Sequence, residues 1–236
     1  MAELEKQASR IEDLEQAGAR VEQFKALIPF KEQLKATRGT GNDSEIYNLL
    51  RGRRSKLVSS VITAELAQRP SAEGFLTSQI EQEQDPDMQV TALQLLGHLR
   101  SPLARLAALK FLAHEHDRHR EVALFVLGWV GEEEDIKVLN RHMLEETSQL
   151  LRITAASALR QIFFRNPALK DALLESLRAG FMNEKDDEVL KWIIVMIESV
   201  ATKKLGLRED KEDPDLVHGD LEKAREKTMQ YFASGK

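Results

Sequence analysis

The sequence predicts an all-α protein built from repeated helix hairpins, and three observations support this fold class. The composition is rich in Leu, Ala, Glu, Lys and Arg, and only 6% of the residues are aromatic, which favours helices over sheets. Four segments of the chain are similar to one another, with starts 31, 32 and 38 residues apart. Apolar residues recur at helical spacing in these segments, so each one presents an apolar stripe to a core.

The four similar segments begin at Met88, His119, Leu151 and Val189, and a weaker copy begins at Leu57. A second helical pattern separates successive copies, over residues 101–113, 132–144 and 167–181. In the first of these patterns Ser101 is a candidate N-cap, because Pro102 follows it and suits the first turn of a helix. Each repeat is therefore expected to be a pair of helices.

The third copy, Leu151-Arg152-x-x-Ala155-Ala156-x-Ala158-Leu159, resembles the second-helix pattern V-R-x-x-A-A-x-A-L-G of HEAT repeats. An acidic residue before the helix, usual in that family, is matched by Asp85 or Asp87, Asp117 and Asp187. The resemblance to HEAT-like, PBS-lyase-type repeats covers residues 67–201. It implies a right-handed α-α superhelix, a HEAT-like solenoid, with helical caps at the N-terminus and C-terminus. The fourth copy departs from the pattern, with Leu190 in place of Arg.

We expect three parts along the chain. Residues 1–66 form an N-terminal helical cap region that includes a candidate degenerate first repeat, residues 67–202 form the HEAT-like repeats, and residues 203–236 form a polar linker and a C-terminal helix. The N-terminal 36 residues are expected to form one helix or two, with Pro29 as a candidate break or new helix start. Their amphipathic face comprises Leu4, Ile11, Leu14, Val21, Phe24 and Ile28. The helices there either cap the first repeat or form a coiled-coil dimer.

The composition excludes several classes of function. The chain has no Cys, which excludes disulfides, thiolate metal sites and a cysteine nucleophile. The net charge of −5 does not favour nucleic-acid binding by bulk charge. The N-terminal segment does not have the pattern of a signal peptide, and the longest apolar run, residues 192–197, is far too short for a membrane span. A soluble, cytoplasmic protein is expected, without a membrane association.

The most metal-like string is His114-Glu115-His116-Asp117-Arg118-His119. It falls at a predicted turn, where its side chains are expected to point outward, and its spacing is not that of a known zinc motif. The abundant carboxylate pairs lie at predicted helix starts, where capping and the helix dipole explain them. We therefore predict no catalytic residue, no cofactor and no metal site.

The densest basic run contains Arg51, Arg53, Arg54 and Lys56. Four positive charges in six residues are typical of a phosphate-binding patch, although no aromatic residue lies among them to stack on bases. The alternative is a solvated helix start.

The second helices of a HEAT-like fold line its concave surface, and their positions off the core stripe carry unusual aromatic residues. Phe125, Trp129 and Trp192 fall on this register, and Arg120, Arg152 and Arg160 lie near it. Aromatic and arginine side chains are common anchors of binding surfaces. We therefore predict that Arg120, Phe125, Trp129, Arg152 and Trp192 bind a partner. The alternative is that Trp129 and Trp192 are wedged between adjacent repeats.

These features favour a non-enzymatic interaction or scaffold module that binds a protein segment through its second helices. The alternative is a nucleic-acid-binding protein similar to the HEAT-like alkylpurine DNA glycosylases, which hold DNA in a basic groove. A similarity to HEAT-like bilin lyases is weaker, because nothing in the sequence indicates a bilin site. The sequence leaves open whether the chain is a monomer or a dimer.

Overall fold

The computed structural model describes residues 1–52, 54–213 and 216–234, and it confirms an all-α fold of HEAT-like helix hairpins. The described chain divides into two compact units, Met1–Leu99 and Arg100–Lys236. The helices of the first unit are α1 (Ala2–Gln16), α2 (Arg20–Ala36), α3 (Asp43–Asn48), α4 (Lys56–Ala67), α5 (Ala72–Gln82) and α6 (Pro86–His98). Those of the second are α7 (Pro102–Phe111), α8 (Asp117–Val130), α9 (Asp135–Glu145), α10 (Gln149–Arg165), α11 (Lys170–Asn183), α12 (Asp187–Ala201) and α13 (Leu221–Ala233), with a 3-10 turn, Pro167–Leu169, before α11.

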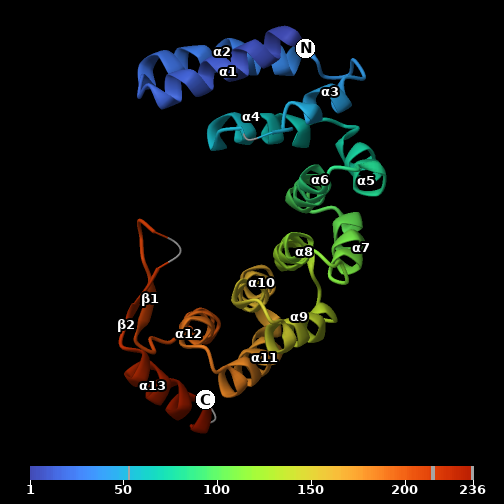
Figure 1. Cartoon of the computed structure of the whole chain (residues 1–236). Coiled ribbons are helices and arrows are strands. Elements are labelled where there is room, and N and C mark those ends of the chain that lie inside the picture. Colours follow the sequence, from blue (N-terminus) through green and yellow to red (C-terminus); the bar gives the residue numbers. More distant parts are fainter. Residues whose placement is uncertain (53, 214–215, 235–236) are drawn as a thin grey trace. The chain divides into compact units, whose positions relative to one another are not determined.

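The first unit begins with a hairpin of α1 and α2 that packs against α4 (Figure 1). Gly18 ends α1 in the left-handed region, with φ of 67°, which glycine adopts without a steric penalty. The buried face of α1 comprises Leu4, Ala8 and Ile11, and that of α2 comprises Leu27, Phe30 and Leu34. The helical cap region at the N-terminus is thus present.

The apolar face predicted for α2 is wrong. Val21, Phe24 and Ile28 are 62%, 67% and 54% exposed, because α2 turns a different face, that of Leu27 and Phe30, toward the unit. Pro29 is neither a break nor a new helix start, since it lies inside α2.

The rest of the first unit contains the short helix α3, then α4 and the α5–α6 hairpin. Tyr47 on α3 is fully buried and donates a hydrogen bond to the carbonyl of Met88 at the start of α6. Ser55 caps α4 by accepting from the N–H of Val58 at 3.3 Å. Asp85 caps α6, as one of the two predicted alternatives.

In the second unit the helix pairs stack in two layers (Figure 1). The second helices α8, α10 and α12 lie side by side in one layer, and α9 and α11 pack together in the other, with α7 packed on α8. Ser101 caps α7, as predicted, by accepting from the N–H of Leu103 at 3.1 Å. The cap of α12 is Asp186 rather than Asp187, and α8 begins at Asp117 with His116 in the cap position.

The C-terminal segment is more ordered than predicted. Within residues 203–219, expected as a linker, β1 (Leu207–Glu209) and β2 (Val217–Gly219) pair antiparallel, with Arg208 opposite His218. Asp220 caps α13 as predicted, by accepting from the N–H of Lys223 at 3.1 Å. Both β1 and α13 pack on α12, and Ala224 and Thr228 are fully buried in that contact layer.

Helices α8 and α10 approach each other closely at Gly128. A Cβ at this position would lie 3.1 Å from the Cα of Ala158 and 3.2 Å from the Cβ of Gln161. Only glycine, which has no side chain, allows α8 and α10 to pack at this distance. The glycine of the repeat pattern is therefore explained by helix packing.

We predict that Gly128→Leu lowers the free energy of unfolding by about 1–3 kcal/mol, because the new side chain forces α8 away from α10. Thermal unfolding followed by circular dichroism at the helical signal measures the effect. Gly74→Leu on α5 is the control, because nothing lies within 4 Å of a Cβ there and leucine is the better helix former. Equal thermal midpoints for the Gly128 variant and the wild type would contradict the close packing.

Candidate functional site

An aromatic pair lies on the second-helix layer of the second unit. Phe125 and Trp129, one turn apart on α8, meet edge to face with ring centroids 4.4 Å apart. Phe125 is 40% exposed, and Trp129 is half-buried. Exposed aromatic side chains in mutual contact are held rigid, which lowers the entropy lost when they bind a partner.

The neighbouring helix α10 extends this surface. Phe164 is 58% exposed, and the guanidinium of Arg160 lies 6.0 Å from its ring centroid. Arg160 also forms a 2.8 Å ion pair with Glu209 of β1, so the C-terminal hairpin borders the surface. We call Phe125, Trp129, Arg160 and Phe164 the aromatic face. Phe164 is not among the predicted binding residues, although it lies four residues, about one helical turn, beyond Arg160.

Trp192, predicted to bind a partner, is buried. It is 9% exposed and lies on α12, which packs against α10, α11, β1 and α13. Val122 and Val195, on the same predicted register, are also buried. For Trp192 the structure therefore favours the wedged alternative, and its side chain is part of the core.

Arg120 and Arg152, also predicted to bind a partner, are engaged in contacts between repeats. Arg120 at the start of α8 pairs with Glu146, which ends α9, through N–O distances of 3.0 and 3.2 Å. Arg152 at the start of α10 pairs in the same way with Glu184, which ends α11, at 2.8 and 3.3 Å. We call these two ion pairs the arginine ladder.

Each arginine of the ladder also closes the preceding loop. Arg120 donates to the carbonyls of His114 and Glu115 at 2.9 and 3.0 Å, and Arg152 donates to those of Glu146 and Thr147 at 3.0 and 3.1 Å. These groups lie at helix ends and loops, where main-chain carbonyls lack helical partners. The guanidinium groups are therefore structural, and the ladder leaves them poorly available to a partner.

The other layer has a comparable tie. Arg105 on α7 holds Asp135 at the start of α9, with N–O distances of 2.6 and 3.0 Å. Asp135 is buried and also accepts from the N–H of Glu132 at 2.8 Å.

The ladder shifts the pKa of its carboxylates. Burial alone would raise the pKa of Glu146, but hydrogen bonds from Arg120 and His142 outweigh burial and hold this pKa below its ordinary value. For Glu184, burial again acts to raise the pKa. Hydrogen bonds from Arg152 and from the main-chain N–H groups of Asp186 and Lys185 outweigh this effect and lower the pKa. Both groups therefore stabilise the fold as charged carboxylates.

The predicted basic patch is largely neutralised. Arg51 pairs with Glu83 at 2.5 Å and with Asp85 at 3.2 Å, and Arg54 bonds Glu5 and lies 3.2 Å from Glu12. Lys56 is exposed, and Arg53 lies outside the described residues. Arg51 and Arg54 are thus bound to carboxylates of the first unit rather than gathered in a phosphate-binding patch.

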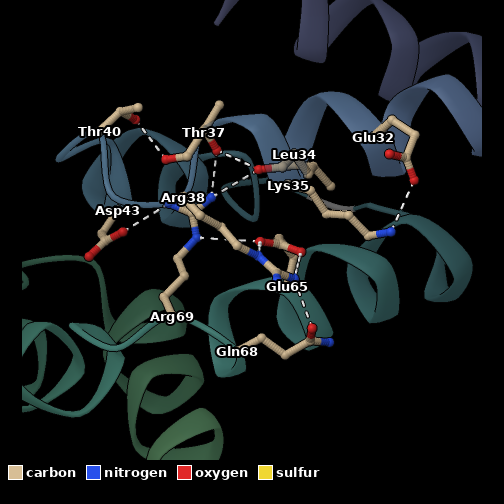
Figure 2. A network of polar contacts seen from close by, with 10 residues as sticks. All are labelled: Glu32, Leu34, Lys35, Thr37, Arg38, Thr40, Asp43, Glu65, Gln68 and Arg69. Atoms are coloured by element: carbon tan, nitrogen blue, oxygen red, sulfur yellow. Dashed lines mark hydrogen bonds and ion pairs between the residues drawn. The ribbon is translucent and has the colours of Figure 1, made fainter.

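A second ion-pair network joins α2 to α4 (Figure 2). Arg38 holds Glu65 through two N–O contacts of 2.6 Å and donates to Gln68 at 2.7 Å. The buried Arg69 donates to Asp43 at 2.9 Å and to the carbonyl of Leu34 at 3.2 Å. These contacts fix the end of α2 on α4.

Of the metal-like string, His116 is exposed as expected, but His119 is not. His119 is 2% exposed, and its ring stacks on that of His114 at 3.8 Å with 8° between the planes. The ring of His116 lies 5.2 Å from that of His114. Among the described residues no group of three or more His, Cys, Asp or Glu residues is arranged to hold a metal ion.

The fold defines a helical-repeat protein, and the comparison with protein families gives the kind of repeat. Residues 74–160 match the family model for HEAT repeats, which confirms the resemblance for this part of the chain. The matched segment includes Phe125 and Trp129. No curated protein and no solved structure gives a significant match. Within the described residues, no helix has the length and apolar character needed to span a membrane.

We predict that Arg152→Ala lowers the stability of the second unit by about 1–3 kcal/mol, because it leaves the partly buried Glu184 and two loop carbonyls without their donor. Urea unfolding followed by tryptophan fluorescence reports this unit, since both Trp residues lie in it. The control is Arg118→Ala, which breaks only an exposed pair with Glu121 and should cost less than about 0.5 kcal/mol. Equal losses in the two variants would contradict a structural ladder.

We also predict acid sensitivity. A carboxylate whose pKa is lowered by folding contributes stability above its unfolded pKa, about 4.3 for Glu, and loses this contribution as pH falls through the lower folded value. Urea unfolding at a series of pH values from 6 to below 4 should therefore show falling stability, and Glu184→Gln should make this fall shallower. An identical pH slope in the variant and the wild type would be the contrary result.

Proposed function

We propose that this protein is a non-enzymatic interaction module that binds a protein segment on the aromatic face of α8 and α10. HEAT repeats commonly mediate protein interactions, because stacked helix pairs present an extended, rigid surface. The observation that carries the proposal is the contacting pair of Phe125 and Trp129 on α8, together with exposed Phe164 on the adjacent helix α10. In a chain with 6% aromatic residues, this concentration on two adjacent helices is a candidate hot spot.

The chemistry of the aromatic face suits a protein segment with apolar or aromatic side chains. Phe125 and Phe164 offer exposed apolar surface. The ring of Trp129 is half-buried, so it is held in place and adds a rigid part to this surface. Arg160 is partly neutralised by Glu209, so the face carries little net charge of its own. Binding there should depend on burial of apolar surface more than on ion pairs.

The nucleic-acid alternative has no supporting observation in the described residues. Arg51, Arg54, Arg120 and Arg152 are all held by carboxylates, and a phosphate would have to displace these carboxylates. No residue group with the geometry of a catalytic site emerges from the described contacts, and the proposal therefore includes no reaction.

We predict that Phe125→Ala with Phe164→Ala abolishes or weakens at least tenfold the binding of the main protein partner, while the thermal midpoint changes little, because both side chains are exposed. Quantitative affinity capture from the native host identifies a partner, and titration with that purified partner measures the dissociation constant. Leu106→Ala is the control, since Leu106 is comparably exposed but lies on α7. A partner that binds the double variant as well as the wild type would contradict the proposal.

A further inference from the structure

One side of α2 is apolar in its first half and cationic in its second half. Val21, Phe24 and Ile28 are exposed, and Lys31 and Lys35 follow them at helical spacing on the same side of the helix. The three apolar residues lie outside the buried face of α2, which is formed by Leu27, Phe30 and Leu34. Three large exposed apolar side chains on successive turns form a surface patch that favours association.

The cationic half of α2 opens into a cleft against α4. The cleft has a volume of about 340 Å³. Its lining includes Lys31 and Lys35 of α2 with Arg38 just after that helix, and Ser60 and Val61 of α4 with Gln68 just after that helix. Figure 2 shows Arg38, just after α2, beside Glu65 and Gln68, and Lys35 extending toward Glu32. The cleft therefore has a basic wall from α2 and a mostly neutral wall from α4.

The charges in this cleft are unbalanced. Glu65 is the one carboxylate among the lining residues, and Arg38 already binds both of its oxygens at 2.6 Å. Lys35 has an exposed pair with Glu32, of the kind that stabilises little, and no carboxylate of the described residues lies within 4 Å of Lys31. Two lysine ammonium groups thus remain available for an anionic ligand.

We propose that α2 and the α2–α4 cleft bind a protein segment that carries apolar side chains at one end and acidic side chains at the other. The apolar end lies on Val21, Phe24 and Ile28, and the acidic end lies at Lys31 and Lys35. This surface belongs to the first unit and is independent of the aromatic face in the second. It accounts both for the uncovered apolar stripe and for the unbalanced cations at its end.

A protein segment fits better than the two other polyanions that could approach lysines. A nucleic acid would meet the lysines but would leave most of the apolar stripe without a matching surface. An anionic bilayer would also meet Glu32, which lies beside the same side of α2 and would repel it. A protein segment with apolar side chains at one end and acidic side chains at the other matches both halves of the surface, and its contact is narrow enough to avoid Glu32.

The test uses two 17-residue helical peptides, of the length of α2. Each peptide has three Leu residues on one face of one half and three Glu residues on the same face of the other half. The first peptide has the Leu half at its N-terminus and the second has it at its C-terminus, so that binding parallel and antiparallel to α2 are both tested. Binding of labelled peptide to the full chain is measured by fluorescence anisotropy. The variants are Lys31→Glu with Lys35→Glu, and Phe24→Ser. The control is Lys6→Glu with Lys110→Glu, which changes net charge equally at exposed sites elsewhere.

The expected result is that one of the two peptides binds, that its scrambled version does not, and that added salt weakens binding. The Lys31/Lys35 variant and the Phe24 variant each weaken binding by about tenfold or more, whereas the control variant does not. Failure of both peptides to bind overturns the proposal, as does equal binding to the control and the Lys31/Lys35 variant. Tighter binding to phosphatidylserine-containing vesicles or to single-stranded DNA than to either peptide also overturns it.

Discussion

The arginine ladder is the interaction on which the second unit most depends. A stack of helix hairpins leaves helix ends at each loop, and the carbonyls there need donors from outside their own helix. In this chain one guanidinium supplies two such donors and simultaneously holds the carboxylate that ends the next first helix. Each repeat is therefore tied to the following one by the same residue that closes its own loop. The same kind of contact recurs in the first unit, where Arg51 holds Glu83 at the end of α5.

This constraint determines which side chains remain for function. Arg120 and Arg152 lie at the start of the second helices, near the surface expected to bind a partner, yet the ladder holds both. The side chains that remain accessible on α8 and α10 are largely aromatic and polar. Gly128 contributes to this arrangement, because it allows close packing of α8 and α10, the two helices that carry the exposed aromatic residues. Stability and recognition are thus assigned to different residues of the same helices.

The repeats and their helices could be predicted because their signals are local. Apolar spacing, Ser101 followed by Pro102, and Asp220 before the last helix each act within a few residues, and the structure confirms these helices. The faces that depend on tertiary neighbours were harder to predict. Trp192 lies on the same register as Phe125 but is buried, because α12 has neighbours on several sides whose packing no periodicity in α12 reveals. The exposed stripe of α2 was predicted as core for the same reason, since the helix pattern does not show which apolar face a neighbour covers.

Charge partners are the other feature that a single sequence conceals. The basic run at Arg51–Lys56 appears concentrated along the chain, but its described arginines bind carboxylates at distant positions, such as Glu12 and Glu83. The arginines of the HEAT pattern were visible as pattern residues, whereas their glutamate partners, 26 and 32 residues further along, were not. The cationic cleft of α2 and α4 was missed because its residues come from two helices and form no run.

The most direct test of the central claim is a double-mutant cycle on Arg152 and Glu184. The free energies of unfolding of the wild type, Arg152→Ala, Glu184→Ala and the double variant are measured by urea with tryptophan fluorescence. If the ladder is structural, we expect a coupling energy of about 1–3 kcal/mol between the two residues, because each side chain contributes little to the free energy of unfolding without the other. Additivity within about 0.3 kcal/mol would show that the two side chains act independently and would contradict the ladder as the organising constraint.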